Sequence, residues 1–122
     1  KFEFSTMAFG CAVGLTKAIN FLNEVGVENI FQYNRQLADI LVTGPRSRDA
    51  VITSPLDDKD RSSIVTAYFE NIDSKEIISD LKAAQVFISS RAGAMRFSPH
   101  LYNTAEDIHS ALTEIDNIIT NL

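Results

Sequence analysis

The chain has 122 residues, of which 45% are hydrophobic and 22% charged, which is enough for one globular domain with a hydrophobic core. With a formal net charge of -5, the chain is not expected to have the basic surface that binds nucleic acids and anionic membranes, so we expect neither as a partner. One cysteine excludes an intrachain disulfide, two histidines do not suggest a zinc site, and the absence of a membrane-span pattern or a secretory signal pattern predicts a cytoplasmic protein.

Periodicity predicts an amphipathic helix near the start of the chain. Between Ala8 and Val25, apolar residues recur at spacings of three and four, and Gly26 is placed to end the helix. Gly10 and Gly14 weaken its first turns, because each glycine costs about 1 kcal/mol relative to alanine. We interpret them as a sign that another backbone or a ligand passes close to this end, with close helix packing as an equal alternative.

A second helix is predicted from residue 27 to residue 42, with Gly44-Pro45 stopping it. The stretch from residue 45 to residue 63 is rich in charged and turn-forming residues and predicts a surface loop, with a short possible strand at Ala50 to Thr53. Ile64 to Phe69 is β-branched and aromatic enough to form a strand.

The second half alternates helices and strands. Asp73 or Ser74 is placed to cap a third helix, and Thr104 with Asp107 forms a variant of the capping box that opens a last helix. Two short strands are predicted between these helices, Val86–Ser90 and Met95–Ser98. The order helix, helix, strand, strand, helix, strand, strand, helix predicts an α+β fold, in which helices pack on one face of a small antiparallel sheet.

Two arginines form the candidate site. Arg91 ends one predicted strand, Ala92-Gly93 make a turn, and Arg96 lies in the next strand, so both guanidinium groups are expected at one edge of the sheet. A guanidinium group can bind two oxygens of a carboxylate or phosphate at once. The alternative is a salt bridge to one of the 16 acidic residues. His100, in the following turn, is more often structural than a base.

At these residues the sequence resembles a family. RFSPHLYNTAEDI (Arg96 to Ile108), preceded by ISSRAG (Ile88 to Gly93), is similar to the C-terminal signature of the class V aminotransferases. This family of pyridoxal-phosphate enzymes includes the cysteine desulfurase, selenocysteine lyase and isopenicillin N epimerase group. KFEFSTMAFGCAVGLTKAINFLNEVGVENI (Lys1 to Ile30) resembles a second family pattern, whereas Gly44 to Ser63 carries none of the resemblance.

The resemblance implies roles for three residues. Arg96 would bind the α-carboxylate of an amino-acid substrate. Thr6 would donate its hydroxyl group to the cofactor phosphate of the neighbouring subunit in a homodimer, although it could equally serve as an N-cap. Arg91 matches a family arginine near the active-site loop, and we expect it at the substrate or cofactor edge.

The sequence also departs from the family pattern. Cysteine desulfurases carry a nucleophilic cysteine in a loop after the position of Arg91, where this chain has only a short turn without a thiol, so a persulfide mechanism there is not expected. Cys11 lies within a predicted helix, at a position more often held by a small core residue. No lysine here matches the Schiff-base lysine, which in this family lies in the large domain.

The resemblance therefore implies that residues 1–10 end the large, pyridoxal-phosphate-binding domain of a fold-type I enzyme and that residues 11–122 form its C-terminal small domain. Such a domain would close over the substrate and would be inactive alone. A desulfurase-like or selenocysteine lyase activity and an epimerase or transaminase activity both remain open. The alternatives are a free-standing α+β module that binds a small carboxylate through both arginines and a purely structural interaction domain.

Overall fold

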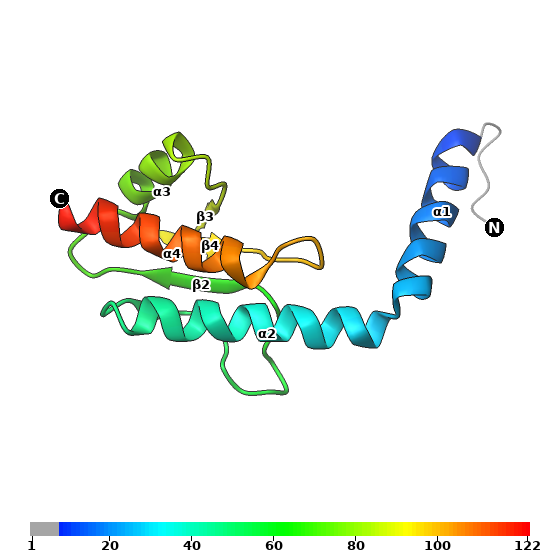
Figure 1. The fold of residues 1–122 in the computed structure, drawn as a ribbon, viewed down its shortest axis with the longest axis horizontal. Coiled ribbons are helices and arrows are strands. Elements are labelled where there is room, and N and C mark those ends of the chain that lie inside the picture. The colour runs from blue at the N-terminus through cyan, green and yellow to red at the C-terminus, as the bar shows by residue number, and fades with distance from the viewer. Residues whose placement is uncertain (1–7) are drawn as a thin grey trace.

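The computed structural model describes residues 8–122 (Figure 1). The elements are, in chain order, α1 (Phe9–Val25), α2 (Val27–Arg46), β1 (Val51–Ile52), β2 (Val65–Tyr68), α3 (Ser74–Ala83), β3 (Ser89–Arg91), β4 (Ala94–Phe97) and α4 (Ala105–Thr120). The predicted order of helices and strands is thus confirmed. No helix among the described residues is both long and apolar enough to cross a membrane.

The four strands form one antiparallel sheet in the order β1-β2-β4-β3. Successive side chains of a strand point to opposite faces, and one face of the two central strands is buried. The residues on this face are Val65, Ala67, Met95 and Phe97, each at most 3% exposed. Helices α2 and α3 contact the strands, α4 contacts both of these helices, and all three pack with these residues in one hydrophobic core. The predicted α+β fold is confirmed.

Local sequence signals correctly place several helix ends. The Asp73 carboxylate accepts a hydrogen bond from the Lys75 amide at 2.9 Å and caps α3. Thr104 and Asp107 form a complete capping box at the start of α4, with reciprocal bonds of 3.1 and 2.8 Å. These caps satisfy amide groups that have no partner inside the helix.

Helix α1 extends away from the rest of the fold (Figure 1). It ends at Gly26 as predicted, where φ is +91°, but none of its residues is buried against the other described residues. Nothing described lies within 4 Å of a Cβ placed at Gly10 or Gly14, so no close approach occurs there within residues 8–122. The apolar side chains of α1 are therefore left facing outward, including Phe9, which is 71% exposed.

The prediction that Gly44-Pro45 stops the second helix is wrong. Helix α2 continues to Arg46, with Pro45 inside its last turn and almost completely buried. A proline near a helix end loses a single intrahelical hydrogen bond, and burial of its ring offsets that loss. Gly44 has a packing role instead, because a Cβ there would lie 3.0 Å from Leu112 Cδ2 and still closer to Cδ1.

Replacement of Gly44 by alanine should lower the free energy of unfolding by about 1 kcal/mol. The added methyl group forces α2 away from Leu112, at a cost of about 1 to 3 kcal/mol, of which the better helix propensity of alanine restores up to about 1 kcal/mol. Urea unfolding of the variant would measure the difference. Gly14→Ala is the matched control, since nothing described lies near that position. A more stable Gly44→Ala variant would contradict close packing of α2 against α4.

The predicted strand boundaries in the second half need correction. Residues 86–88 are not part of a strand, and β3 covers Ser89–Arg91. Gln85 adopts a left-handed conformation, with φ of +62°, and the Val86 amide donates to the Leu81 carbonyl at 2.8 Å, which ends α3. The chain then needs three further residues before it can pair with β4.

The predicted loop between β1 and β2 is held against α2 by ion pairs. Arg35 pairs with Asp58 at 2.6 Å, and Arg61 pairs with Asp39. The Arg35 guanidinium group also donates to the Arg61 carbonyl at 3.4 Å. Ion pairs whose carboxylate is exposed, as in both of these, contribute about 1 kcal/mol or less each, so they position the loop more than they stabilise the fold.

Candidate functional site

The two candidate arginines lie on a single tight hairpin. Strands β3 and β4 are joined by Ala92 and Gly93, whose φ angles are +50° and +83°. Positive φ at both central residues is the requirement of a type I′ turn, whose twist matches that of the paired strands. An alanine in this conformation is strained, whereas glycine is not. The turn without a thiol that the sequence predicts is therefore present.

The strand register places Arg91 and Arg96 on the same face of the sheet. Arg96 pairs with Thr66 of β2 on one side and with Ser89 of β3 on the other, and Arg91 pairs with Ala94. Directly paired residues share a face, and so do residues two apart along a strand. This face is opposite the one that the helices cover. Because β3 is an edge strand, Arg91 lies at the edge of the sheet, but Arg96 lies on the central strand β4, so the prediction that both arginines lie at one edge is wrong for Arg96.

Neither arginine has an ion-pair or side-chain hydrogen-bond partner among residues 8–122. The sequence left a structural salt bridge open as the alternative, and the described residues supply none. Three other arginines, Arg35, Arg48 and Arg61, do pair with aspartates. Arg96 is half-buried and Arg91 exposed, so the site offers one partly desolvated and one accessible cation.

The segment after β4 is a fixed turn. The His100 amide donates to the Asn103 side-chain oxygen at 3.1 Å, and the Asn103 amide donates back to the His100 carbonyl at 2.8 Å. The Tyr33 hydroxyl group donates to the Asn103 carbonyl at 2.8 Å and ties the turn to α2. The His100 and Tyr102 rings lie 5.6 Å apart. These contacts support the structural interpretation of His100 and of the turn into the last helix.

The remaining candidates do not join the arginines. Thr6 lies outside the described residues. Cys11 is exposed on α1, so its expected place as a small core residue is not found within residues 8–122. The same part of the chain brings no three potential metal ligands together.

No lysine belongs to the described strands that carry or flank the arginines. Those among residues 8–122 lie on α1, in the loop between β1 and β2 and on α3, namely Lys17, Lys59, Lys75 and Lys82. The described residues therefore fit the binding of a carboxylate but provide no lysine that could hold pyridoxal phosphate beside it.

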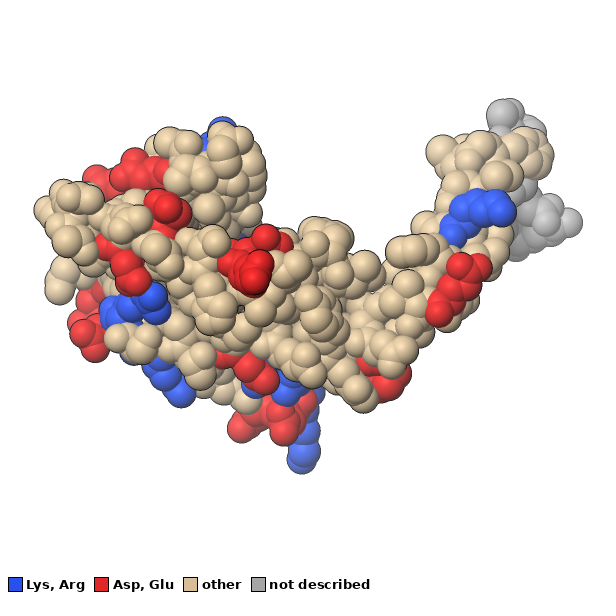
Figure 2. All heavy atoms as spheres, viewed as in Figure 1, with Lys and Arg blue, Asp and Glu red and all other residues tan. Residues whose placement is uncertain are grey.

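A groove of about 510 Å³ opens on the helical side of the fold. It lies between residues 85–88, the end of β4 and the first turns of α4, and is lined by apolar side chains such as Phe87, which is 70% exposed. No local sequence pattern indicates this groove, because it depends on where separate segments of the chain meet. Figure 2, viewed as Figure 1, shows acidic side chains over α4, whereas few charged side chains lie on α1.

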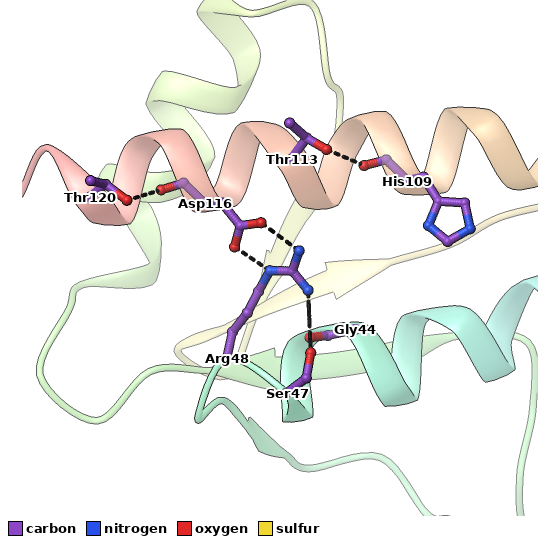
Figure 3. A network of polar contacts seen from close by, with 7 residues as sticks. All are labelled: Gly44, Ser47, Arg48, His109, Thr113, Asp116 and Thr120. Carbon is purple, nitrogen blue, oxygen red and sulfur yellow. Dashed lines mark hydrogen bonds and ion pairs between the residues drawn. The ribbon is translucent and has the colours of Figure 1, made fainter.

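A polar network that was not predicted from the sequence joins the end of α2 to α4 (Figure 3). The Arg48 guanidinium group donates through Nε and Nη2 to the two carboxylate oxygens of Asp116 and through Nη1 to the Gly44 carbonyl at 2.8 Å. The hydrogen bond from Arg48 lowers the pKa of Asp116, and Asp116 raises the pKa of Arg48. The two residues are 68 positions apart, so no local pattern indicates the pair.

Removal of this ion pair should lower the free energy of unfolding at neutral pH and leave the free energy of unfolding unchanged in acid. The lowered pKa of Asp116 means that the folded state favours the carboxylate, so the stabilisation is complete above about pH 4, the ordinary value for aspartate, and is lost as the pH falls through the folded-state pKa. Asp116→Asn should cost about 1 kcal/mol or less at pH 7, because the Asp116 side chain is 47% exposed.

Urea unfolding at pH 7 and at pH 3 would test this expectation, with Asp57→Asn as the control at an exposed position without an ion pair in the described structure. A loss of equal size at both pH values would contradict the ion pair as its cause.

Comparisons with known proteins agree with this fold. The sequence model of the family "Aminotransferase class-V" matches residues 1–110. An uncharacterized aminotransferase of Schizosaccharomyces pombe is 31% identical over 121 residues, which cover 99% of this chain and 30% of that protein. A probable cysteine desulfurase of Halalkalibacterium halodurans is 28% identical over 88% of this chain and 29% of that protein.

Solved structures of other proteins share the fold of this chain. The apo structure of a cysteine desulfurase from Thermococcus onnurineus superposes with a TM-score of 0.92 at 19% identity, over 99% of this chain and 34% of that one. The chain thus spans about a third of the length of the relatives it matches. Because the family match covers most of its residues, the chain belongs to the class-V aminotransferase family.

Proposed function

We propose that this chain is the C-terminal small domain of a pyridoxal-phosphate-dependent enzyme that acts on an amino acid. The observation that carries the proposal is Arg96, which is half-buried on the uncovered face of the sheet with no carboxylate partner among residues 8–122. In the proposed enzyme, residues 1–10 end the large domain and residues 11–122 form the small domain. The large domain supplies the lysine that holds the cofactor.

Arg96 binds the α-carboxylate of the substrate in this proposal. Its guanidinium group donates two parallel hydrogen bonds to the two carboxylate oxygens, and the central strand β4 fixes its backbone. Thr66 and Ser89 flank it on the neighbouring strands and offer hydroxyl groups to the same region. Fixing the carboxylate orients the bonds at the substrate Cα and excludes unproductive poses. When bound, pyridoxal phosphate supplies the electron sink for cleavage of one of those bonds.

The Ala92-Gly93 turn argues against a persulfide mechanism at this hairpin. A nucleophilic thiol needs a position at which it can reach the substrate, and the two-residue turn supplies none. Cys11 is far from this hairpin in the sequence, near the start of the chain on the projecting helix α1. We therefore favour a reaction other than that of the classical cysteine desulfurases; the candidates are a selenocysteine lyase or desulfurase-like reaction without a thiol at this hairpin, and an epimerase or transaminase reaction.

The proposed enzyme is a cytoplasmic homodimer. Thr6 donates its hydroxyl group to the cofactor phosphate of the neighbouring subunit, and Arg91 lies at the substrate or cofactor edge. The outward apolar face of α1 supports a larger assembly, because a free helix with Phe9 and Val13 more than 60% exposed loses the stabilisation that burial of these side chains provides.

An absorbance spectrum of the full-length product of the gene that encodes this chain tests the proposal. Purified with added pyridoxal phosphate, the protein should show a near-ultraviolet or visible band that is absent without the cofactor and shifts when amino acids are added. Without such a band, the better account is a module that binds small carboxylates through Arg91 and Arg96, since both residues belong to one hairpin of this chain.

A further inference from the structure

The second arginine of the hairpin has a fixed position relative to the first. Arg91 pairs with Ala94, two residues before Arg96 on β4, so the two arginines are diagonal neighbours on one face. Such neighbours lie about 7 to 8 Å apart at the level of their backbones. The two-residue turn sets the register, because a slip by one residue would turn one arginine to the other face.

The charges on this face are not balanced by the described residues. Around the arginines the sheet presents Thr66, Tyr68 and Ser89, none of which is an acidic residue. The two arginines are therefore diagonal neighbours on this face, with no acidic residue of the described strands between them, in a protein whose net charge is -5. An amino-acid α-carboxylate neutralises one of them and leaves the other without a partner among residues 8–122.

The two arginines also differ in a way that separates their roles. Arg96 is half-buried between two neighbouring strands, which suits a ligand group present in every substrate. Arg91 is exposed on the edge strand beside the turn, where its long side chain can reach a group farther from Cα. Each guanidinium group matches one planar, two-oxygen anion.

We infer that Arg91 binds a second anionic group on the substrate, so that the enzyme selects amino acids whose side chain ends in a carboxylate or a similar anion. The inference rests on the proposed function, in which Arg96 binds the α-carboxylate. In this role, Arg91 discriminates between a substrate with an acidic side chain and its neutral counterpart.

Calorimetric titration of the full-length gene product with two matched ligand pairs tests this inference. Aspartate and asparagine, like glutamate and glutamine, have nearly the same size and differ in the charge of the side chain. The acidic member of at least one pair should bind about tenfold more tightly. Arg91→Gln should reduce that ratio to about one. Arg46→Gln, which removes the same charge from an exposed site at the end of α2, should leave it unchanged.

The outcomes separate the inference from the proposed function. If both members of each pair bind equally well and Arg96→Ala weakens both, the inference fails and the proposed function stands. If no amino acid binds, both fail. If Arg91→Gln weakens binding of pyridoxal phosphate and leaves the ratio unchanged, Arg91 contacts the cofactor phosphate, and the inference is overturned. Circular dichroism of each variant would confirm that it is folded.

Discussion

Replacement of Arg96 by alanine in the full-length gene product should lower kcat/KM for its amino-acid substrate by about 2 to 4 kcal/mol in transition-state stabilisation, which is a factor of about 30 to 1000. The loss follows from removal of a charge-assisted, two-point contact that both binds and orients the substrate. Steady-state kinetics would measure it. Arg96→Lys should recover part of the loss, since lysine keeps the charge but lacks the planar fork.

The matched control is Arg46→Ala, which removes an exposed arginine from the far end of α2 and should leave the kinetics unchanged. The separate changes in KM and kcat are informative as well. A rise in KM together with a fall in kcat indicates both binding and orientation. An unchanged KM in the Arg96→Ala variant would eliminate the carboxylate contact and, with it, the assignment of the site to this face of the sheet.

Replacement of Leu81 by alanine should lower the free energy of unfolding by about 2 to 5 kcal/mol. Leu81 belongs to α3, is 0% exposed and packs in the core that also contains Met95 of the sheet and Ile115 of α4. Truncation leaves a cavity that the three elements cannot close by moving together. Urea unfolding would report the change as a lower midpoint with an unchanged m-value.

Leu56→Ala provides the comparison, because Leu56 lies in the loop between β1 and β2 and is 37% exposed. It should change the free energy of unfolding by less than about 0.5 kcal/mol. Similar losses in the two variants would show that α3 is not part of the cooperative core.

Local patterns predicted the helix starts well. The capping residues Asp73 and Thr104 act over two or three positions, so the signal and its structural effect lie within the same few residues. Gly26 likewise ends α1 because of its own backbone conformation. The apolar spacing of α4 indicated its buried side, on which Ile108, Leu112 and Ile115 pack in the core.

Features that depend on tertiary contacts were predicted less well. Gly44-Pro45 has the pattern of a helix end, yet packing against Leu112 and burial of the proline ring carry α2 through both residues. The start of β3 depends on pairing with β4, which the composition of residues 86–90 does not specify. The periodicity of α1 correctly indicated a helix but could not reveal that its apolar side has no cover among residues 8–122.

The candidate site was predictable in its chemistry and only partly in its geometry. The turn at Ala92-Gly93 and the edge position of Arg91 follow from the short spacing between the arginines. That Arg91 and Arg96 share a face depends on the register of the hairpin. That neither has an acidic partner among residues 8–122 depends on where the aspartates of distant segments lie, as the Arg48–Asp116 pair illustrates.

Helix α1 has a consequence for experiments on the whole protein. Its 17 residues are close to the length at which an isolated helix is only marginally stable in water, and no described residue buries any of them. Its amide hydrogens should therefore exchange quickly in this chain alone and slowly once another surface covers the helix. Amide exchange along residues 9–25 would thus report assembly separately from the stability of the core, which the amides of β2 and β4 would report in the same experiment.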